Sequence, residues 1–275
     1  MIQIKNLKFS YGDETLALND LSLDIKKGKY IAIMGENGAG KSTLIKHLNG
    51  LLKPKSGTVT IDGLSIQNTS VSKLSEKVGI VFQYPEFMFF SESVEEEISF
   101  ALKNFGFEKE KIKTIISTYL KTFGLTRYLK QSPFILSGGE QRRLAIACIL
   151  SWNPEYVVLD EPTAGQDKYQ RDLLKKIISK LISENKTVII VSHDVEFIAE
   201  TQPYIHLMAN GEIIGSGDAK DVLSDNILIN KSGLIYPQIN EFIKKLNWNL
   251  TENLLNPSDV ANEILSIIEK KDSNV

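Results

Sequence analysis

The chain has 275 residues, of which 42% are hydrophobic and 24% are charged, a composition that is ordinary for a globular protein. Its net charge of −2 argues against the broad electropositive surface of a nucleic-acid-binding protein. The single cysteine, Cys148, excludes an intrachain disulfide, and its apolar surroundings favour a buried thiol. No apolar run approaches the roughly 20 residues that a membrane-spanning helix needs, so we expect any membrane role to require docking on another subunit.

Short strands are predicted for the first part of the chain. Residues 2–9 alternate between apolar and polar side chains, and further strands are expected at Leu21–Ile25 and Thr58–Ile61. The intervening run Tyr30–Met34 is apolar throughout, which is typical of a strand covered on both faces. We therefore expect an antiparallel sheet wrapped around one buried strand.

A phosphate-binding loop is predicted directly after that buried strand. The residues fit the pattern GxxxxGK[ST], and a helical pattern follows, which is the structural context that the motif requires. Glycines let backbone N–H groups converge on phosphate oxygens, Lys41 reaches the β- and γ-phosphates, and the Ser42 hydroxyl can bind Mg²⁺. The predicted nucleotide-binding residues here are Gly35, Asn37, Gly38, Ala39, Gly40, Lys41, Ser42 and Thr43.

The middle of the chain has a helical pattern. After a buried strand at Gly79–Phe82, apolar residues recur at helical spacing over Lys109–Phe123. The run Leu136-Ser137-Gly138-Gly139-Glu140-Gln141 then places Ser137 as an N-cap with Glu140 three residues later, a capping box before a helix over Gln141–Leu150. The glycine-rich start of this helix is a second candidate anion site.

Two adjacent acids follow the buried strand Tyr156–Leu159. Charges at the end of an apolar strand are costly unless a metal or a partner requires them. We therefore expect Asp160 to hold Mg²⁺ and Glu161 to act as the general base on the attacking water.

The last third contains further elements. A helix is predicted over Tyr169–Leu181, a buried strand over Val188–Val191, and a hairpin over residues 205–214 with Asn210-Gly211 at its turn. A final amphipathic helix is expected from Ser258, which can cap it, and residues 270–275 are expected to be loose.

These motifs resemble those of the ATP-binding cassette (ABC) ATPases. LSGGE is similar to that family's signature, usually LSGGQ, with Glu140 in the last position. The resemblance implies an α/β fold: a P-loop, RecA-like core, an antiparallel β subdomain and a helical signature subdomain. It also implies a head-to-tail dimer that binds ATP and Mg²⁺, in which Ser137, Gly138, Gly139 and Glu140 complete the ATP site around the partner's Lys41.

Other positions match the same family. Gln83 resembles the Q-loop glutamine, which is implied to contact Mg²⁺ and the attacking water, and His193 resembles the switch histidine that contacts the γ-phosphate. Tyr11 stands where the family places an aromatic residue against adenine. Asp167 matches the D-loop, although Gln166 and Lys168 replace the usual leucine and proline, a departure that bears on communication across the dimer rather than on ATP binding.

More particular stretches are similar to the energy-coupling factor (ECF) transporter ATPases, the branch that includes CbiO. The resemblance covers residues 1–217, weakly continues to Pro237, and rests on the segments 81–86, 89–90, 103–106 and 132–135. Met88 departs from the glutamine of many relatives. The resemblance implies an ATPase domain over residues 1–217, with its helical subdomain at about 86–153, and a dimerisation or regulatory extension over 218–275.

This branch implies a function at the cytoplasmic face of the cell membrane. The ATPase pairs with an identical or paralogous subunit and powers uptake of a vitamin or a Co²⁺ or Ni²⁺ ion. A transmembrane coupling subunit docks near Gln83–Phe90, and a small membrane protein captures the solute. Residues 87–90 either form this apolar contact surface or pack the helical subdomain.

Other functions remain open from the sequence. The nearest is the ATPase of a conventional ABC transporter. Soluble ABC proteins of ribosomes generally carry two cassettes, and DNA-repair ABC ATPases insert a long coiled coil that is missing between Lys41 and Ser137. A module that uses ATP only for assembly would not need both Glu161 and His193. No nucleic-acid partner is expected.

Overall fold

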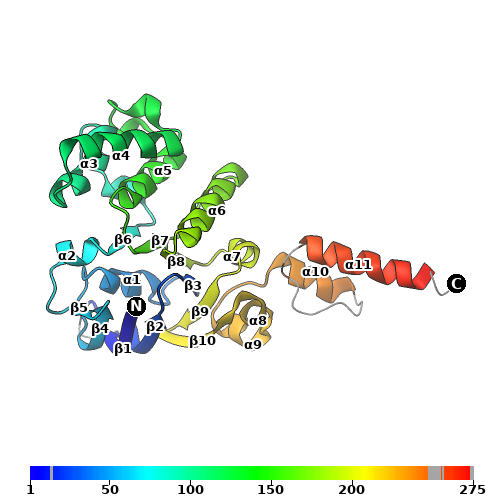
Figure 1. Ribbon diagram of the computed structural model, residues 1–275. Helices are drawn as coiled ribbons and strands as arrows, with labels where there is room; N and C mark the ends of the chain where they lie inside the picture. The colour runs from blue at the N-terminus through cyan, green and yellow to red at the C-terminus, as the bar shows by residue number, and fades with distance from the viewer. Residues whose placement is uncertain (13–14, 247–254, 256, 273–275) are drawn as a thin grey trace.

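The computed structural model describes residues 1–12, 15–246, 255 and 257–272, and contains two sheets with helices around them (Figure 1). The first sheet is antiparallel, with strand order β2-β1-β4-β5. Its strands are β1 (Ile2–Phe9), β2 (Leu18–Ile25), β4 (Ser56–Ile61) and β5 (Leu64–Ser65).

The second sheet has strand order β10-β9-β3-β8-β7-β6 and is parallel except for β10. Its strands are β3 (Tyr30–Met34), β6 (Val78–Val81), β7 (Tyr156–Asp160), β8 (Thr187–Ser192), β9 (Tyr204–Ala209) and β10 (Glu212–Asp218). Because the carboxyl ends of parallel strands meet at one edge, the loops after β3, β6, β7 and β8 come together there.

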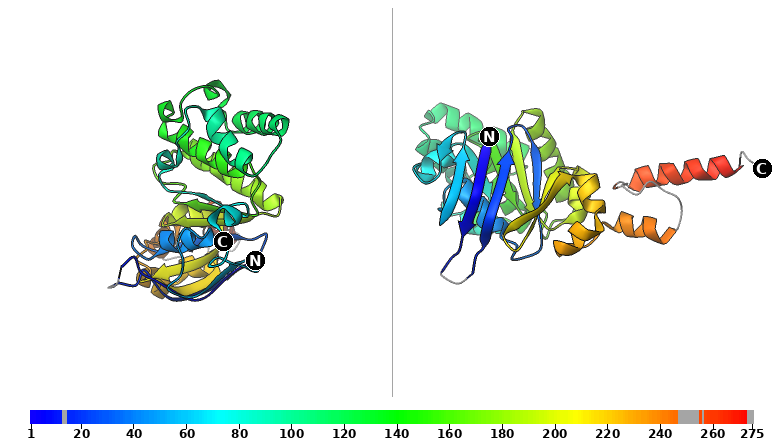
Figure 2. Two further views of the ribbon diagram at one scale, coloured as in Figure 1. Left: turned by 90° about the vertical axis from the view of Figure 1, so that its left-hand side faces the viewer. Right: turned by 90° about the horizontal axis from the view of Figure 1, so that it is seen from below.

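The helices divide between the sheets and a separate group. Helices α3, α4 and the start of α5 stand apart from both sheets (Figures 1 and 2). In chain order the helices are α1 (Lys41–Leu48), α2 (Val71–Ser75), η1 (Pro85–Met88), α3 (Val94–Asn104), α4 (Lys109–Thr122), η2 (Thr126–Tyr128), η3 (Pro133–Ile135), α5 (Gly138–Leu150), α6 (Lys168–Ser183), α7 (Val195–Thr201), α8 (Ala219–Ser224), α9 (Asn226–Lys231), α10 (Gln238–Leu246) and α11 (Pro257–Asp272).

The core lies on both faces of the parallel sheet. In β3, Ile31 and Ile33 lie on the face that packs with α1 and the antiparallel sheet. Ala32 and Met34 lie on the opposite face, which packs with α5, α6 and α7. This division follows from the alternation of side chains along a strand. It also explains why the central strands are apolar at every position, since neither face meets solvent.

The predicted strands are present, and the hairpin predicted over residues 205–214 extends from Tyr204 to Asp218. The strand predicted to end at Phe82 ends at Val81, and the signature helix begins at Gly138 rather than Gln141. The prediction that Ser258 caps the last helix was wrong, because α11 begins at Pro257. Residues 270–272 are helical rather than loose, and 273–275 lie outside the described residues.

The region after β10 has two parts. Helices α8 and α9 contribute Val222, Leu223 and Ile229 to the main core cluster. Helices α10 and α11 project away from it (Figures 1 and 2) and share a small apolar cluster around Ile243 and Val260. The packing of α8 and α9 therefore continues the core beyond residue 217. Across the described ranges, no helix has the length and apolar character needed to cross a membrane.

Candidate functional site

The glycine-rich loop joins β3 to α1 and wraps around the ammonium group of Lys41. Nζ of Lys41 donates to the carbonyl oxygens of Gly35 at 2.8 Å and Glu36 at 2.9 Å. Gly40 stands at the N-cap of α1 with φ 98°, a conformation that favours glycine. Burial lowers the pKa of Lys41, and the nearby carboxylates of Glu161 and Asp160 oppose this shift.

Neighbouring elements hold this loop in place. The amide of Gly211, at the tip of the β9–β10 hairpin, donates to the Ala39 carbonyl at 3.1 Å. A Cβ atom on Gly40 would lie 2.5 Å from the carbonyl oxygen of Ala17, so the backbone approaches too closely there for any side chain. The amides at the start of α1 are thus held on a fixed frame, as anion binding requires.

Ser42, Asp160 and Gln83 line one cavity of about 260 Å³. The Ser42 hydroxyl donates to Oδ2 of Asp160 at 3.2 Å, while Oδ1 is buried and lacks a hydrogen-bond partner among the described residues. Burial raises the pKa of Asp160 to about 6, with the Ser42 hydrogen bond opposing the rise. A hydroxyl, an amide and a carboxylate with an unused oxygen are a donor set that fits Mg²⁺.

Glu161 follows β7 and meets His193 from the end of β8. Nδ1 of His193 lies 2.8 Å from Oε1 of Glu161, and the Ser192 hydroxyl donates to Oε2 at 3.4 Å. Glu161 is buried and has φ 45°, which non-glycine residues adopt only where the surroundings fix it. A carboxylate held in this way can accept a proton from a bound water.

Arg142 was missed by the sequence analysis. Its guanidinium group donates from Nη1 to the Glu161 carbonyl at 2.7 Å and from Nη2 to the Gln83 carbonyl at 3.0 Å. Because both acceptors belong to the main chain, no residue-type pattern indicated them. The signal that was available is an arginine three residues after Gly139, in the second turn of the glycine-rich helix.

The signature residues lie at the start of α5. Oε2 of Glu140 accepts from the Ser137 amide at 3.0 Å and hydroxyl at 2.8 Å, so the predicted capping box is confirmed. Oε1 accepts from Arg127 at 3.0 Å and Tyr128 at 2.8 Å. Burial alone would raise the pKa of Glu140, but these hydrogen bonds lower it to about 2.

Two predicted contact residues have local partners. Asp167 caps α6 by accepting from the Gln170 amide at 2.8 Å. Tyr11 is 65% exposed, and its hydroxyl lies 3.1 Å from Oγ1 of Thr43 on α1. Tyr11 therefore lies beside the phosphate loop. Within the described part of the chain, no hydrogen bond joins the signature residues or Asp167 to that loop.

The segment Gln83–Ser91 has a mixed surface. Tyr84, Phe87 and Phe90 are exposed, with Phe87 at 84%. Phe89 is buried and Met88 packs against the core, so of the two alternatives stated for residues 87–90, these two residues follow the one in which they pack the helical subdomain. The exposed aromatic side chains recur at every third residue, so Phe87 and Phe90 remain available for contact, whereas Met88 and Phe89 pack inward.

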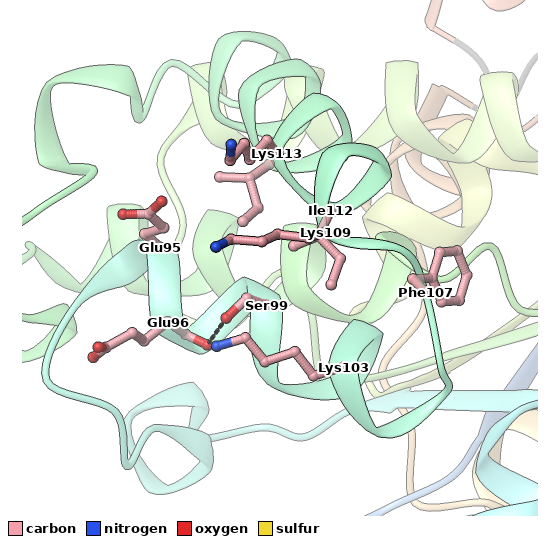
Figure 3. A pocket seen from close by; sticks show the side chains of 9 residues that line it. Glu95, Glu96, Ser99, Lys103, Phe107, Lys109, Ile112 and Lys113 are labelled. Carbon is pink, nitrogen blue, oxygen red and sulfur yellow. Dashed lines mark hydrogen bonds between the residues drawn. The ribbon is translucent and has the colours of Figure 1, made fainter.

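A larger cavity of about 530 Å³ lies between α3 and α4 (Figure 3). Its lining combines apolar side chains such as Phe107 and Ile112 with charged ones such as Glu95, Lys103 and Lys109. None of the residues predicted for nucleotide or metal binding lines it. The chemistry indicated by the motifs therefore belongs to the smaller cavity at the sheet edge.

Comparison with known proteins gives concordant matches. The family model described as "ABC transporter" matches residues 18–164. The energy-coupling factor transporter ATP-binding protein EcfA2 of Clostridium tetani is 39% identical, over 99% of each chain. The solved structure of cbiO1 from Clostridium perfringens, part of the ABC transporter complex cbiONQ, has a TM-score of 0.74 and 34% identity over 88% of this chain and 98% of that one.

A second solved structure is the ATP-binding cassette MJ0796, whose dimer is described in a post-hydrolysis state with ADP and Pi. It has a TM-score of 0.72 and 29% identity, and the match covers 80% of this chain and 99% of that one. The predicted P-loop α/β fold is therefore confirmed.

Proposed function

The chain belongs to the ABC transporter family, as an ATP-binding protein of the energy-coupling factor type, and we propose that it hydrolyses Mg-ATP with Glu161 to power uptake of a small solute. An ATPase that drives transport binds a nucleotide as its substrate. The proposal assigns the residues of this chain to the steps of that reaction.

The phosphate groups bind at the loop between β3 and α1. Backbone amides of Gly38, Gly40 and the first turn of α1 donate to the phosphate oxygens, and Lys41 exchanges its carbonyl partners for the β- and γ-phosphates. Tyr11, which is exposed beside Thr43, stacks on the adenine. The same loop makes the remaining contacts through Gly35, Asn37, Ala39, Ser42 and Thr43.

Ser42, Asp160 and Gln83 are the residues that would hold Mg²⁺, because their oxygens line one cavity and one oxygen of Asp160 is buried without a partner. When bound, Mg²⁺ neutralises charge on the phosphates.

Glu161 accepts the proton of the attacking water, and His193 orients the Glu161 carboxylate through the 2.8 Å contact and reaches the γ-phosphate. The single observation that carries the proposal is this carboxylate–imidazole pair, held next to the Ser42–Asp160 pair at one sheet edge.

A second chain completes each ATP site. Ser137 and Gly138 are exposed at the start of α5, with no hydrogen bond to the phosphate loop among the described residues. In the proposed head-to-tail dimer, Ser137, Gly138, Gly139 and Glu140 of one chain meet the γ-phosphate held by the other chain's Lys41. Asp167 lies at the same interface, next to α6.

The membrane assembly supplies the remaining partners. The chain is peripheral at the cytoplasmic face, and the exposed side chains of Tyr84, Phe87 and Phe90 receive a transmembrane coupling subunit. A separate small membrane protein captures a vitamin or a Co²⁺ or Ni²⁺ ion. Within residues 218–275, the projecting helices α10 and α11 expose Phe242 and Leu265, which supports a dimerisation or regulatory role.

The catalytic assignment is tested with Glu161→Gln. The variant should bind ATP with a Kd within about threefold of wild type, while kcat falls by at least about 100-fold because the base is lost. Glu155→Gln, near the opposite end of β7, is the matched control and should keep wild-type turnover. Wild-type kcat in Glu161→Gln would overturn the assignment of the base.

The transport assignment is tested by a gentle pull-down from native membranes solubilised in detergent. We expect a coupling subunit and at least one small integral membrane protein to co-purify. If a conventional ABC permease co-purifies instead, the chain serves another importer class, and recovery of soluble partners alone would contradict a role in transport.

A further inference from the structure

One half-buried side chain connects three motifs of the site. Arg142 lies in α5, the helix that begins with the signature residues, and its two terminal nitrogens bind the main-chain carbonyls of Glu161 and Gln83, at 2.7 Å and 3.0 Å. Glu161 is the proposed base, and Gln83 begins the segment Gln83–Ser91, which carries the exposed side chains of Tyr84, Phe87 and Phe90. A single guanidinium group therefore touches the helix of the signature, the base and the start of the docking segment.

The bridge lies just beyond the end of the pairing between the two strands that precede Gln83 and Glu161. β6 and β7 are parallel neighbours, paired from Val78↔Tyr156 to Val81↔Leu159. Beyond that pairing, Arg142 links the two segments that follow the strands, because it donates to the Gln83 carbonyl on one side and the Glu161 carbonyl on the other. The Glu161 backbone is in the left-handed region, so a fixed partner at its carbonyl stabilises a conformation that would otherwise be costly.

A second charged side chain holds the far end of the same segment. Glu97 of α3 is buried, and its Oε2 accepts from the amides of Phe90 at 3.1 Å and Ser91 at 2.9 Å. The segment is thus fixed at both ends by side chains from two helices of the helical group. A shift of the segment relative to that group must therefore move Arg142 or break its bonds.

We propose that Arg142 is a positioning residue that couples the docking segment Gln83–Ser91 to the carboxylate of Glu161. This inference rests on the proposed function, in which Glu161 is the base and the segment meets the membrane partner. Displacement of Gln83 by a partner is transmitted through the guanidinium group to the Glu161 carbonyl, and so to the alignment of the base.

The chemistry of the bridge requires arginine. A planar guanidinium presents two donors in a fixed fork, whereas the ammonium of lysine is a single point that cannot hold two separated carbonyls in the same geometry. Misplacement of a catalytic group by about 1 Å can cost about 100-fold in rate. Loss of the bridge should therefore act on kcat and leave binding at the phosphate loop intact.

The kinetic test compares Arg142→Lys and Arg142→Gln with Arg143→Lys in the full chain. We expect kcat for ATP to fall by roughly 10- to 100-fold in both Arg142 variants, with ATP KM within about threefold. Arg143, the next residue of α5, is the matched control, since its Nε donates to the Phe123 carbonyl at 3.0 Å and its Nη2 lies 3.9 Å from Oε1 of Glu140, with no hydrogen bond to Gln83 or Glu161. Arg143→Lys should keep wild-type kcat.

A spectroscopic test measures the coupling directly, even if turnover is lost for another reason. Phe87→Cys, in a Cys148→Ala background, places one reactive thiol on the exposed segment for a spin label. In the non-hydrolysing Glu161→Gln variant, Mg-ATP should change the label's spectrum. Arg142→Lys in that background should abolish the change while ATP still binds.

The outcomes separate this inference from the proposed function. Wild-type kcat in folded Arg142→Gln, an equal loss of kcat in Arg143→Lys, or a label response that survives Arg142→Lys would each overturn the coupling role. Full turnover in Glu161→Gln would instead contradict the proposed base. The label response would then still decide whether Arg142 links the segment to the nucleotide site.

Discussion

Glu140 is the residue whose ionisation most directly stabilises the start of the signature helix. Both of its oxygens accept hydrogen bonds: Oε2 from the amide and hydroxyl of Ser137, and Oε1 from Arg127 and Tyr128. A glutamine amide would turn its NH₂ group toward one pair of donors in either orientation. Glu140→Gln should therefore lower the free energy of unfolding at pH 7 by about 1–2 kcal/mol, a value discounted because Arg127 is exposed.

The pH dependence of that loss has a definite sign. The pKa of Glu140 is lowered to about 2 in the folded protein, below the ~4.3 of an unfolded glutamate. Its contribution is therefore complete above about pH 4.3 and fades as the pH falls toward 2. Urea unfolding at pH 7, 5 and 3 should show the difference shrinking at pH 3. A pH-independent difference would contradict this account.

At the scale of elements, Glu97 anchors the segment after η1 to α3. Its buried carboxylate accepts two main-chain amides, those of Phe90 and Ser91. Glu97→Ala leaves both donors without this partner, which should cost about 1–3 kcal/mol of local stability. Hydrogen exchange of these two amides should accelerate by roughly 10- to 100-fold. Glu96 is an exposed neighbour on the same helix, so the control Glu96→Ala should leave the exchange of both amides unchanged. Unchanged exchange in Glu97→Ala would contradict the anchoring role.

The elements near the site show what sequence reasoning can and cannot reach. The phosphate loop and the strand before Asp160 were predictable, because glycine spacing and uniformly apolar runs are local signals. The exposure of Phe87 and the burial of Phe89 were not predictable, since the turn at η1 decides which of these two aromatic side chains points into the core. The partners of Arg142 were equally inaccessible, because main-chain carbonyls leave no signature in residue types.

At the scale of the whole molecule, the two helix starts proposed to bind phosphate belong to different parts of the fold. α1 begins between the two sheets, whereas α5 begins in the helical group that stands apart from them (Figure 1). Ser137 is exposed, and its amide and hydroxyl both donate to Glu140 of the helix that it caps. This arrangement fits an ATP that is held by one chain and capped by the signature of another.

The dimer model makes a prediction that depends on the size of one side chain. In a Glu161→Gln background, Mg-ATP should convert the full chain from monomer to dimer, because turnover no longer opens the dimer.

Adding Ser137→Arg places a long cation at the exposed start of α5, where the partner's phosphate loop and Lys41 would have to approach. Light scattering after size exclusion should then report a monomer, while the ATP Kd stays within about threefold. Thr122→Arg, exposed at the end of α4 in the same helical group, should leave the dimer intact. An ATP-dependent dimer of undiminished stability in the Ser137→Arg variant would show that the signature does not lie against the partner's nucleotide, and the shared-site model would have to be abandoned even with the catalytic role of Glu161 upheld.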